Sequence, residues 1–324
     1  MCGGDDRTMK LTDMHCDTPF EIYARRTSLF DGDTCFTVGK CAEYEKVTQV
    51  MAFWSDSEKA PDECYDGFFR MFEYLGHETE NAAEKLRQNG EAFAERFTFI
   101  PAVEGAKLLG GDMARLSVLA QYGVKILTPV WRGADEVGGA YDTDKGLTDF
   151  GKLLVAECGR LGIAVDVSHM SEKSFWDTVN IVSASKEPIT VLASHSNSKR
   201  ICAHERNLTD LQFGMIEKLG GVVGVSSCAK HISAKYAEKM PTDGDLFIDE
   251  VCSHIEHFLS LGGEDNVCLG FDFDGTAASP GLEDVSKVSA IAERLAKHRV
   301  CDGVIEKIIY ANGKNFLGKI IKQP

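Results

Sequence analysis

Residues 162–196 read GIAVDVSHMSEKSFWDTVNIVSASKEPITVLASHS and contain two short apolar runs on either side of a helical pattern. The runs, Ile163–His169 and Ile189–His195, are rich in β-branched residues, which is typical of strands. Ser171 stands where an N-cap would begin the intervening helix. A strand followed by a helix and a second strand indicates a parallel sheet.

The same alternation extends over the whole chain. Six more runs have the length and composition of strands: Met9–His15, Val47–Trp54, Phe97–Glu104, Val124–Thr128, Val222–Ser226 and Val267–Asp272. Helical patterns separate or follow them: Asp62–Arg96 as one long helix or a pair, Asp149–Arg160, Phe213–Leu219 behind a capping box of Thr209 and Gln212, Ile291–His298, and Val304–Ile321 with an optional break at Asn312-Gly313.

Eight strands that alternate with helices predict a (β/α)8 TIM barrel. We expect residues 1–324 to form one such catalytic domain, because closed α/β barrels of this length are common. An open doubly wound sheet is the alternative. Its dinucleotide-binding form has little support, because no G-x-G-x-x-G follows the first strand.

Composition narrows the class of protein. The 324 residues include 35 Lys and Arg against 50 Asp and Glu, a net charge of −15, whereas nucleic-acid and anionic-membrane binders need a basic face. No apolar run approaches the roughly 18 residues of a membrane span, and the opening stretch MCGGDDRTMKLTD lacks the apolar core of a signal peptide. The 11 cysteines form no C-x-x-C pair, which favours buried, reduced thiols. We therefore expect a cytoplasmic protein without nucleic-acid or membrane partners.

Several strand candidates end in residues that bind metals. In a barrel the functional side chains come from the carboxyl ends of the strands. His15 and Asp17 are two residues apart and share one face of a strand. Glu104, His169 and His195 end three other runs. Each also has a structural interpretation, as a hydrogen-bonded core histidine or a salt-bridged glutamate.

Three histidines and two carboxylates are too many for one catalytic zinc ion, which usually takes three protein ligands. They suit two metal ions that share a bridging carboxylate and lower the pKa of a shared water, so that the resulting hydroxide can attack a carbonyl or phosphoryl group. Asp272 and Asp274 follow the last strand candidate and would share a face. Asp272 is the preferred proton shuttle, whereas Asp274, before Gly275, is also compatible with a turn.

In these segments the chain resembles the membrane (renal) dipeptidase family of zinc peptidases, peptidase family M19, among the amidohydrolase-type barrels. The resemblance extends nearly from end to end, through DMHCDTPF, PAVEGA, GLTDFGKLLVAECGRLGIAVDVSHMS, VLASHS, HERN, LGFDFDG with GLEDVSK, and NGKNFL. It implies two zinc ions per chain, with His15 and Asp17 on one ion, His169 and His195 on the other, and Glu104 between them. It also implies Asp272 as the catalytic aspartate, small dipeptides as substrates, and a homodimer.

Arg206, in the HERN segment, matches the family's arginine that receives the C-terminal carboxylate of the dipeptide. A guanidinium suits bidentate binding of a carboxylate, and this requirement would exclude longer peptides. Without the resemblance, Arg206 reads as a surface arginine in a polar loop.

The chain departs from the better-known mammalian members after the fourth strand. They have Leu-Thr-x-Thr-His there, and the histidine contacts the substrate. This chain has LTPVWRG over residues 127–133, so Trp131 takes the histidine's place, as in a bacterial branch of the family. Trp131 can donate one hydrogen bond but cannot be protonated, and both a substrate contact and a packing role stay open. His231 stands near the place of a tyrosine that the family carries after the seventh strand. The mammalian members are secreted and lipid-anchored, and this chain shows neither signal.

Two other functions fit the same residues. The barrel could carry another metallohydrolase, such as an N-acyl-amino-acid hydrolase, a lactonase or a phosphotriesterase, because a fold does not fix a function. Arg206 separates these alternatives, since a substrate without a carboxylate would not need it. A non-catalytic metal-binding barrel is the third interpretation. The stereochemistry of the substrate, L-L or L-D, and the native metal are open at this stage.

Overall fold

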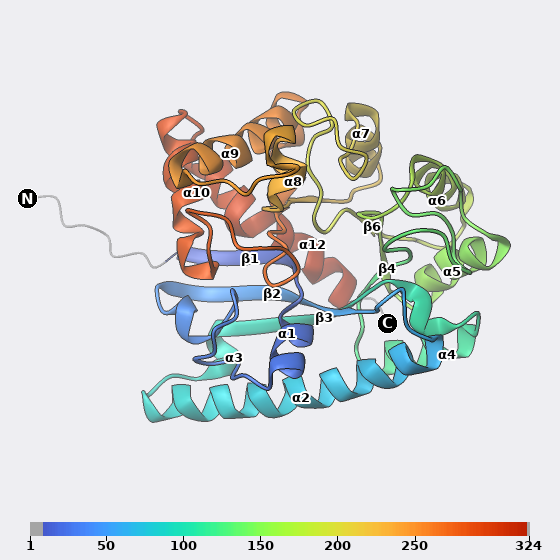
Figure 1. Cartoon of the computed structure of the whole chain (residues 1–324), viewed down its shortest axis with the longest axis horizontal. Helices are drawn as coiled ribbons and strands as arrows, with labels where there is room; N and C mark the ends of the chain where they lie inside the picture. Colours follow the sequence, from blue (N-terminus) through green and yellow to red (C-terminus); the bar gives the residue numbers. More distant parts are fainter. Residues whose placement is uncertain (1–8, 323–324) are drawn as a thin grey trace, which may run out of the picture.

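Eight parallel strands form one sheet, and Figure 1 shows β1, β2 and β3 running side by side through the middle of the molecule. The computed structural model describes residues 9–322. Cys2 and most of the stretch examined for a signal peptide lie outside this range. The strands are β1 (Met9–Cys16), β2 (Tyr44–Trp54), β3 (Phe97–Glu104), β4 (Ile126–Thr128), β5 (Ala164–Asp166), β6 (Val191–Leu192), β7 (Val223–Val225) and β8 (Val267–Leu269).

The strands close into a barrel, which confirms the predicted fold. Their order is β6-β5-β4-β3-β2-β1-β8-β7, and every pair is parallel. A bridge between Ala193 and Val223 joins the two ends of this order. The barrel is tight there, because a Cβ added at Gly224 or Gly270 would lie 2.0 or 1.8 Å from the carbonyl oxygen of Ser194.

Helices surround the barrel, and the predicted ones are present with small shifts at their ends. They are α1 (Thr18–Arg25), α2 (Pro61–Gln88), α3 (Phe93–Arg96), α4 (Met113–Gln121), α5 (Asp149–Arg160), α6 (Glu172–Ala184), α7 (Asp210–Lys218), α8 (Ala229–Ile232), α9 (Gly244–Ser260), α10 (Ser289–Lys297), α11 (Asp302–Glu306) and α12 (Asn312–Ile321). Ser171 caps α6 by accepting a hydrogen bond from the amide of Ser174, and Thr209 forms the predicted capping box with Gln212.

Two helical predictions need refinement. The Asp62–Arg96 pattern is a pair, α2 and α3, and α2 runs along one side of the molecule beside α1 (Figure 1). The C-terminal pattern does not break at Asn312. A π-helical turn over Lys307–Ala311 joins α11 to α12. The side-chain nitrogen Nδ2 of Asn312 donates to the carbonyl oxygens of Glu264 and Val267.

The barrel interior is packed with side chains rather than open. A buried apolar cluster fills it below the carboxyl ends of the strands; its members include Met14, Val50, Ile100, Ile126, Ala164, Leu192 and Cys268. This apolar layer closes the barrel interior beneath the side chains at the carboxyl ends of the strands. None of the helices within residues 9–322 combines the length and apolarity that crossing a membrane requires.

The strands after β4 are shorter than predicted. β5, β6 and β8 end three residues before His169, His195 and Asp272. For β5 and β6 the reason is that side chains capture the next amides: the amide of Ser168 donates to Asp166 Oδ1 instead of a neighbouring strand, and the amide of His195 donates to Ser168 Oγ. These side chains therefore project from loops at the end of the barrel.

Candidate metal centre

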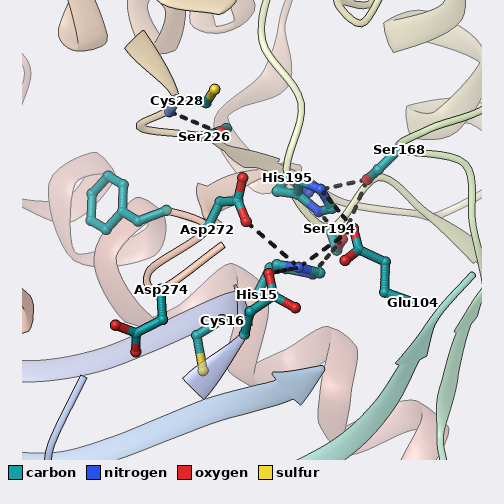
Figure 2. Close-up of polar contacts among 12 residues, drawn as sticks. His15, Cys16, Glu104, Ser168, Ser194, His195, Ser226, Cys228, Asp272 and Asp274 are labelled. Carbon is teal, nitrogen blue, oxygen red and sulfur yellow. Dashed lines mark hydrogen bonds and ion pairs between the residues drawn. The ribbon is translucent and has the colours of Figure 1, made fainter. Parts of the chain in front are cut away.

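The five predicted metal ligands meet at the carboxyl end of the barrel. Figure 2 shows three of them, His15, Glu104 and His195, close together. Glu104 lies in the middle, with its Oε1 2.9 Å from His169 Nε2, 3.4 Å from His195 Nε2 and 3.7 Å from His15 Nε2. Asp17 Oδ2 is 3.4 Å from His15 Nε2. The structure thus brings together residues that are as far apart in sequence as His15 and His195, which are 180 positions apart. All five are buried.

These residues form overlapping sets that could each hold a cation. One set is Glu104, His169 and His195, and a second is His15, Asp17 and Glu104. In each set the ligand atoms lie within 4.8 Å of one another. Glu104 belongs to both of these sets, so a single carboxylate is within reach of two metal positions. A third set, His15, His195 and Asp272, does not include Glu104.

The ligand atoms suit a cation because they carry lone pairs that point towards one another. His169 Nδ1 lies 3.0 Å from the carbonyl oxygen of Trp131. A carbonyl can only accept, so the proton of a neutral His169 is on Nδ1 and its Nε2 carries a lone pair. That Nε2 is 2.9 Å from His195 Nε2. Within the described residues, His15 Nε2 and Asp17 Oδ1 are buried without a hydrogen-bond partner. A bound cation would satisfy all these atoms.

Electrostatics favour positive charge at the same point. Burial lowers the pKa of His15, but the negative charges of Glu104 and Asp17 outweigh burial and raise that pKa to about 10. Burial dominates for the other two histidines and holds the pKa of His169 and of His195 well below the ordinary value. His169 and His195 are thus neutral, the form in which histidine binds metals, whereas His15 would release a proton from Nε2 when a cation binds.

Asp272 lies at the edge of this cluster, where a proton shuttle is expected. Its Oδ1 is 3.8 Å from His15 Nε2, and its side chain is 14% exposed, against 2% for His15. Burial raises the pKa of Asp272 well above its usual range, and the charge of Asp17 acts in the same direction. Asp272 is therefore both accessible and able to hold a proton.

The prediction that Asp272 and Asp274 share a face is wrong. β8 has already ended, and both residues have positive φ values, 64° and 68°, so the two-residue period of a strand does not apply. Figure 2 shows Asp274 pointing away from His15. Its carboxylate instead accepts hydrogen bonds from Thr18 Oγ1 and the amide of Cys35. Asp274 thus ties the first residue of α1 to the segment after that helix rather than joining the cluster.

Arg206 is not a surface residue, which corrects the interpretation from its polar loop. It is 3% exposed and lines a cavity of about 430 Å³ that also contains Glu104 and Asp272. Its Nη1 and Nη2 donate to Ser196 Oγ and to the carbonyl oxygen of His195. Its Nε has no partner in the part of the chain that the structure describes. The charge is therefore held by neutral acceptors and can attract a ligand anion.

Trp131 has the packing role that the sequence offered as one alternative, whereas a contact with the substrate stays a prediction. It lines the same cavity, and it packs edge-on against Trp54, with ring centroids 5.0 Å apart. Trp54 in turn contacts Phe20 at 5.1 Å, so an aromatic wall bounds one end of the cavity. The backbone of Trp131 also fixes His169 through its carbonyl, a role that sequence reasoning missed. His231 lines the cavity too, and its ring is tilted against that of His204, with the centroids 4.7 Å apart.

Sequence reasoning also missed buried residues below the ligands. Asp13 accepts hydrogen bonds from the amides of His15 and Phe271 and thus ties β1 to the segment after β8. Asp166 and Ser194 lie beneath the histidines. The available signal was an acid inside an apolar run, as in AVDV and LTDM, because a buried carboxylate is costly unless it is hydrogen-bonded.

Comparison with known proteins agrees with this geometry. A profile of the family described as membrane dipeptidase, peptidase family M19, matches residues 68–323. An uncharacterised protein in the pqqA 5′ region of Klebsiella pneumoniae is 32% identical over 229 residues, which cover 68% of this chain and 81% of that protein. An uncharacterised dipeptidase of Schizosaccharomyces pombe is 31% identical over 216 residues, which cover 64% of this chain but 48% of the yeast protein. The chain thus spans about half the length of that relative.

Solved structures share the fold. A metallopeptidase of family M19 named dipeptidase AC superposes with a TM-score of 0.84 at 25% identity, covering 98% of this chain and 100% of the other. A metallopeptidase from Rhodobacter sphaeroides, solved with a phosphinate mimic of the dipeptide L-Ala-D-Ala, superposes with a TM-score of 0.81 at 23% identity, covering 97% and 100%. Because the family profile spans most of the chain, the chain belongs to the membrane dipeptidase family, a family of metal-dependent dipeptidases.

Proposed function

We propose that the chain is a dinuclear zinc dipeptidase of the bacterial type. The observation that carries this proposal is the position of Glu104 in two overlapping ligand sets. A carboxylate shared by two sets is the arrangement that a two-metal hydrolase needs. His15 and Asp17 would hold one ion, His169 and His195 the other, and the mixture of imidazole and carboxylate ligands suits zinc.

The chemistry divides between the ions and the protein. Two zinc ions, when bound, would acidify a water molecule and polarise the scissile carbonyl. Asp272, 3.8 Å from His15 Nε2 and at the cavity side of the cluster, would take the proton of the attacking water. It would then deliver this proton to the amine that leaves.

Substrate selection falls to Arg206. Its buried charge would pair with the free C-terminal carboxylate of a dipeptide, while the scissile bond lies towards Glu104 in the same cavity. This arrangement favours dipeptides over longer peptides, because the cavity of about 430 Å³ must hold both ends. A lactonase or phosphotriesterase would have no use for the guanidinium.

Hydrolysis of a dipeptide panel would test the proposal. Zinc-reconstituted protein and a metal-stripped control would be given L-L and L-D dipeptides; the L-D series is included because the Rhodobacter sphaeroides neighbour binds a mimic of L-Ala-D-Ala. We expect cleavage that depends on zinc, with two ions per chain by elemental analysis. Two bound ions without cleavage would transfer the proposal to another acyl or phosphoryl substrate.

Replacing Arg206 would test the carboxylate assignment. Arg206→Ala should raise KM for dipeptides by roughly 100-fold, since a buried charge pair costs about 3 kcal/mol to break, and should change kcat less. Steady-state kinetics on a dipeptide and on its C-terminal amide would measure this. Arg200→Ala, at an exposed position nearby, is the matched control. An unchanged KM in Arg206→Ala would favour a substrate without a carboxylate.

A further inference from the structure

A buried carboxylate lies directly beneath the candidate metal ligands. Asp166 is the last residue of β5 and is fully buried. Its Oδ1 accepts hydrogen bonds from the amides of Ser168 and Ser194, at 3.0 and 2.9 Å, and from Ser168 Oγ at 2.6 Å. Its Oδ2 accepts hydrogen bonds from Thr128 Oγ1 at 2.7 Å and from Ser194 Oγ at 2.6 Å. These donors fix the orientation of both carboxylate oxygens.

Ser194 Oγ joins this carboxylate to two of the histidines. Figure 2 shows Ser194 beside His195 and His15. Ser194 Oγ lies 2.7 Å from His195 Nδ1 and 3.4 Å from His15 Nδ1. A hydroxyl has one proton and two lone pairs. Because Asp166 Oδ2 can only accept, the serine proton is directed at Asp166, and both lone pairs of Ser194 are left to accept from the imidazoles.

The direction of these hydrogen bonds decides the tautomer of each ring. If Ser194 accepts at both contacts, His195 and His15 each carry a proton on Nδ1. The Nε2 atoms then present lone pairs on the opposite side of the rings, where Glu104 Oε1 lies 3.4 Å from His195 Nε2 and 3.7 Å from His15 Nε2. Hydrogen bonds of this kind fix the tautomer and orientation of metal-binding histidines.

We propose that Asp166 and Ser194 form a positioning pair that places a proton on Nδ1 of both His15 and His195 and so reserves their Nε2 atoms for two metal ions. One hydroxyl thereby prepares a ligand for each of the two positions. The inference rests on the proposed function, in which these histidines bind different ions. Neither member of the pair touches the substrate, so both are positioning residues.

Asp166→Asn should reverse the direction of the serine proton. The position of Asp166 Oδ1 faces two backbone N–H groups, so only the amide oxygen of asparagine can occupy it. The amide nitrogen must then take the position of Oδ2 and donate to Ser194 Oγ. Ser194 would direct its own proton at His195 Nδ1, and His195 would carry its proton on Nε2. The change is isosteric, so we expect the fold to survive.

Nitrogen-15 NMR of the imidazoles in metal-free protein reads the tautomer without any catalysis. We expect the Nδ1–H form of His195 in the wild type and the Nε2–H form in Asp166→Asn. The same tautomer in both proteins would overturn the proposal. If the tautomer reverses as expected while the wild type hydrolyses no dipeptide, the positioning pair stands and the proposed function fails, so the two failures are distinguishable.

Metal titration tests the shared role of Ser194. Ser194→Ala should weaken zinc binding at both positions by roughly 10- to 100-fold, the usual effect of losing a partner of a ligand. Ser168→Ala is the comparison variant: Ser168 also donates to Asp166, accepts from the backbone amide of His195 and lies 3.3 Å from Ser194 Oγ, but within the described residues its Oγ bonds to no ring nitrogen. We expect zinc binding by Ser168→Ala to equal that of the wild type. If Ser194→Ala weakened zinc binding at one position only, or if both variants lost the same zinc affinity, the shared role of the Ser194 hydroxyl would be contradicted.

Discussion

At the scale of single residues, the site depends on where each side chain is held as much as on what it is. Asp272 and Asp274 are the same residue type two positions apart, yet one faces the histidines and the other binds Thr18 and the amide of Cys35. The sequence could not separate them, because their left-handed backbone conformation depends on contacts with distant segments. The same holds for Arg206, whose burial comes from hydrogen bonds to His195 and Ser196.

The pair of aspartates offers a direct test. Asp272→Asn should lower kcat by roughly 10²- to 10⁴-fold, as removal of a general acid–base does, while elemental analysis still finds the metal. Asp274→Asn is the matched variant. It should keep kcat near the wild-type value and lower the unfolding temperature, because it weakens the contact with Thr18. Wild-type turnover in Asp272→Asn would remove Asp272 from the mechanism.

Gly275 shows how closely the site is packed. A Cβ at this position would lie 2.0 Å from Asp17 Oδ2 and 2.3 Å from Asp272 Oδ1. Gly275→Ala should therefore displace both carboxylates and reduce kcat/KM by roughly 100-fold, the cost of moving catalytic groups by about 1 Å. Gly303→Ala, where an added Cβ meets nothing within 4 Å, should leave activity unchanged. Comparable kcat/KM values in the two variants would mean that Asp17 and Asp272 tolerate displacement.

At the scale of elements, local sequence patterns predicted which strands and helices are present but not the residues at which the strands end. The eight apolar runs are eight strands, and the caps at Ser171 and Thr209 begin helices as expected, because these signals act over three or four residues. The ends of β5, β6 and β8 were placed three residues late. The ladders of β5 and β6 stop where side chains such as Asp166 and Ser168 capture backbone amides, and no local pattern encodes those bonds.

The capping box of α7 provides a test at this scale. Thr209 Oγ1 accepts from the amide of Gln212 at 3.2 Å, and Gln212 Oε1 accepts from the amide of Thr209 at 2.8 Å. Thr209→Ala should lower the free energy of unfolding by about 1 kcal/mol, the usual value of an N-cap, without changing kcat. Urea denaturation measures the loss, and Thr209→Ser should restore most of it. If Thr209→Ser lost as much free energy of unfolding as Thr209→Ala, the hydroxyl of Thr209 would not be the source of the stabilisation.

At the scale of the whole molecule, the number and alternation of elements predicted the barrel, since eight strands close a (β/α)8 ring. The assembly of the site followed from the fold, because the carboxyl ends of parallel strands meet at one end. What the sequence could not provide is the network below the ligands, which joins β4, β5 and β6 through Asp166. The single domain, the homodimer and the cellular location stay predictions.

Acid should destabilise the whole fold through a histidine remote from the site. His254, on α9, is fully buried; its Nδ1 accepts from the amide of Ser198, and its Nε2 donates to the carbonyl oxygen of Ile232. Burial lowers the pKa of His254 from 6.5 to about 4. As the pH falls, the unfolded chain therefore binds a proton at His254 before the folded protein does. The contribution of neutral His254 to stability is complete above pH 6.5 and declines as the pH falls towards 4, by about 3 kcal/mol in total.

Urea denaturation at several pH values, with His254→Gln as the reference, would isolate this contribution. We expect the difference in unfolding free energy between the two proteins to shrink as the pH falls from 6.5 to 4. NMR titration of the imidazole gives the pKa directly. A pKa near 6.5 would show that His254 charges freely in the folded protein.

The position of β1 between β2 and β8 has a consequence for the order of folding. Closing the ring brings Met9–Cys16 against Val267–Leu269, segments separated by most of the chain, and Asp13 pairs with Leu269 at that seam. His15 and Asp272 meet in the same event. Contacts between such distant segments form slowly, because a long loop must close first. The five proposed metal ligands lie on or just after β1, β3, β5 and β6, so they can come together before the ring closes, whereas a newly made chain has no proton shuttle beside them until its last strand is in place.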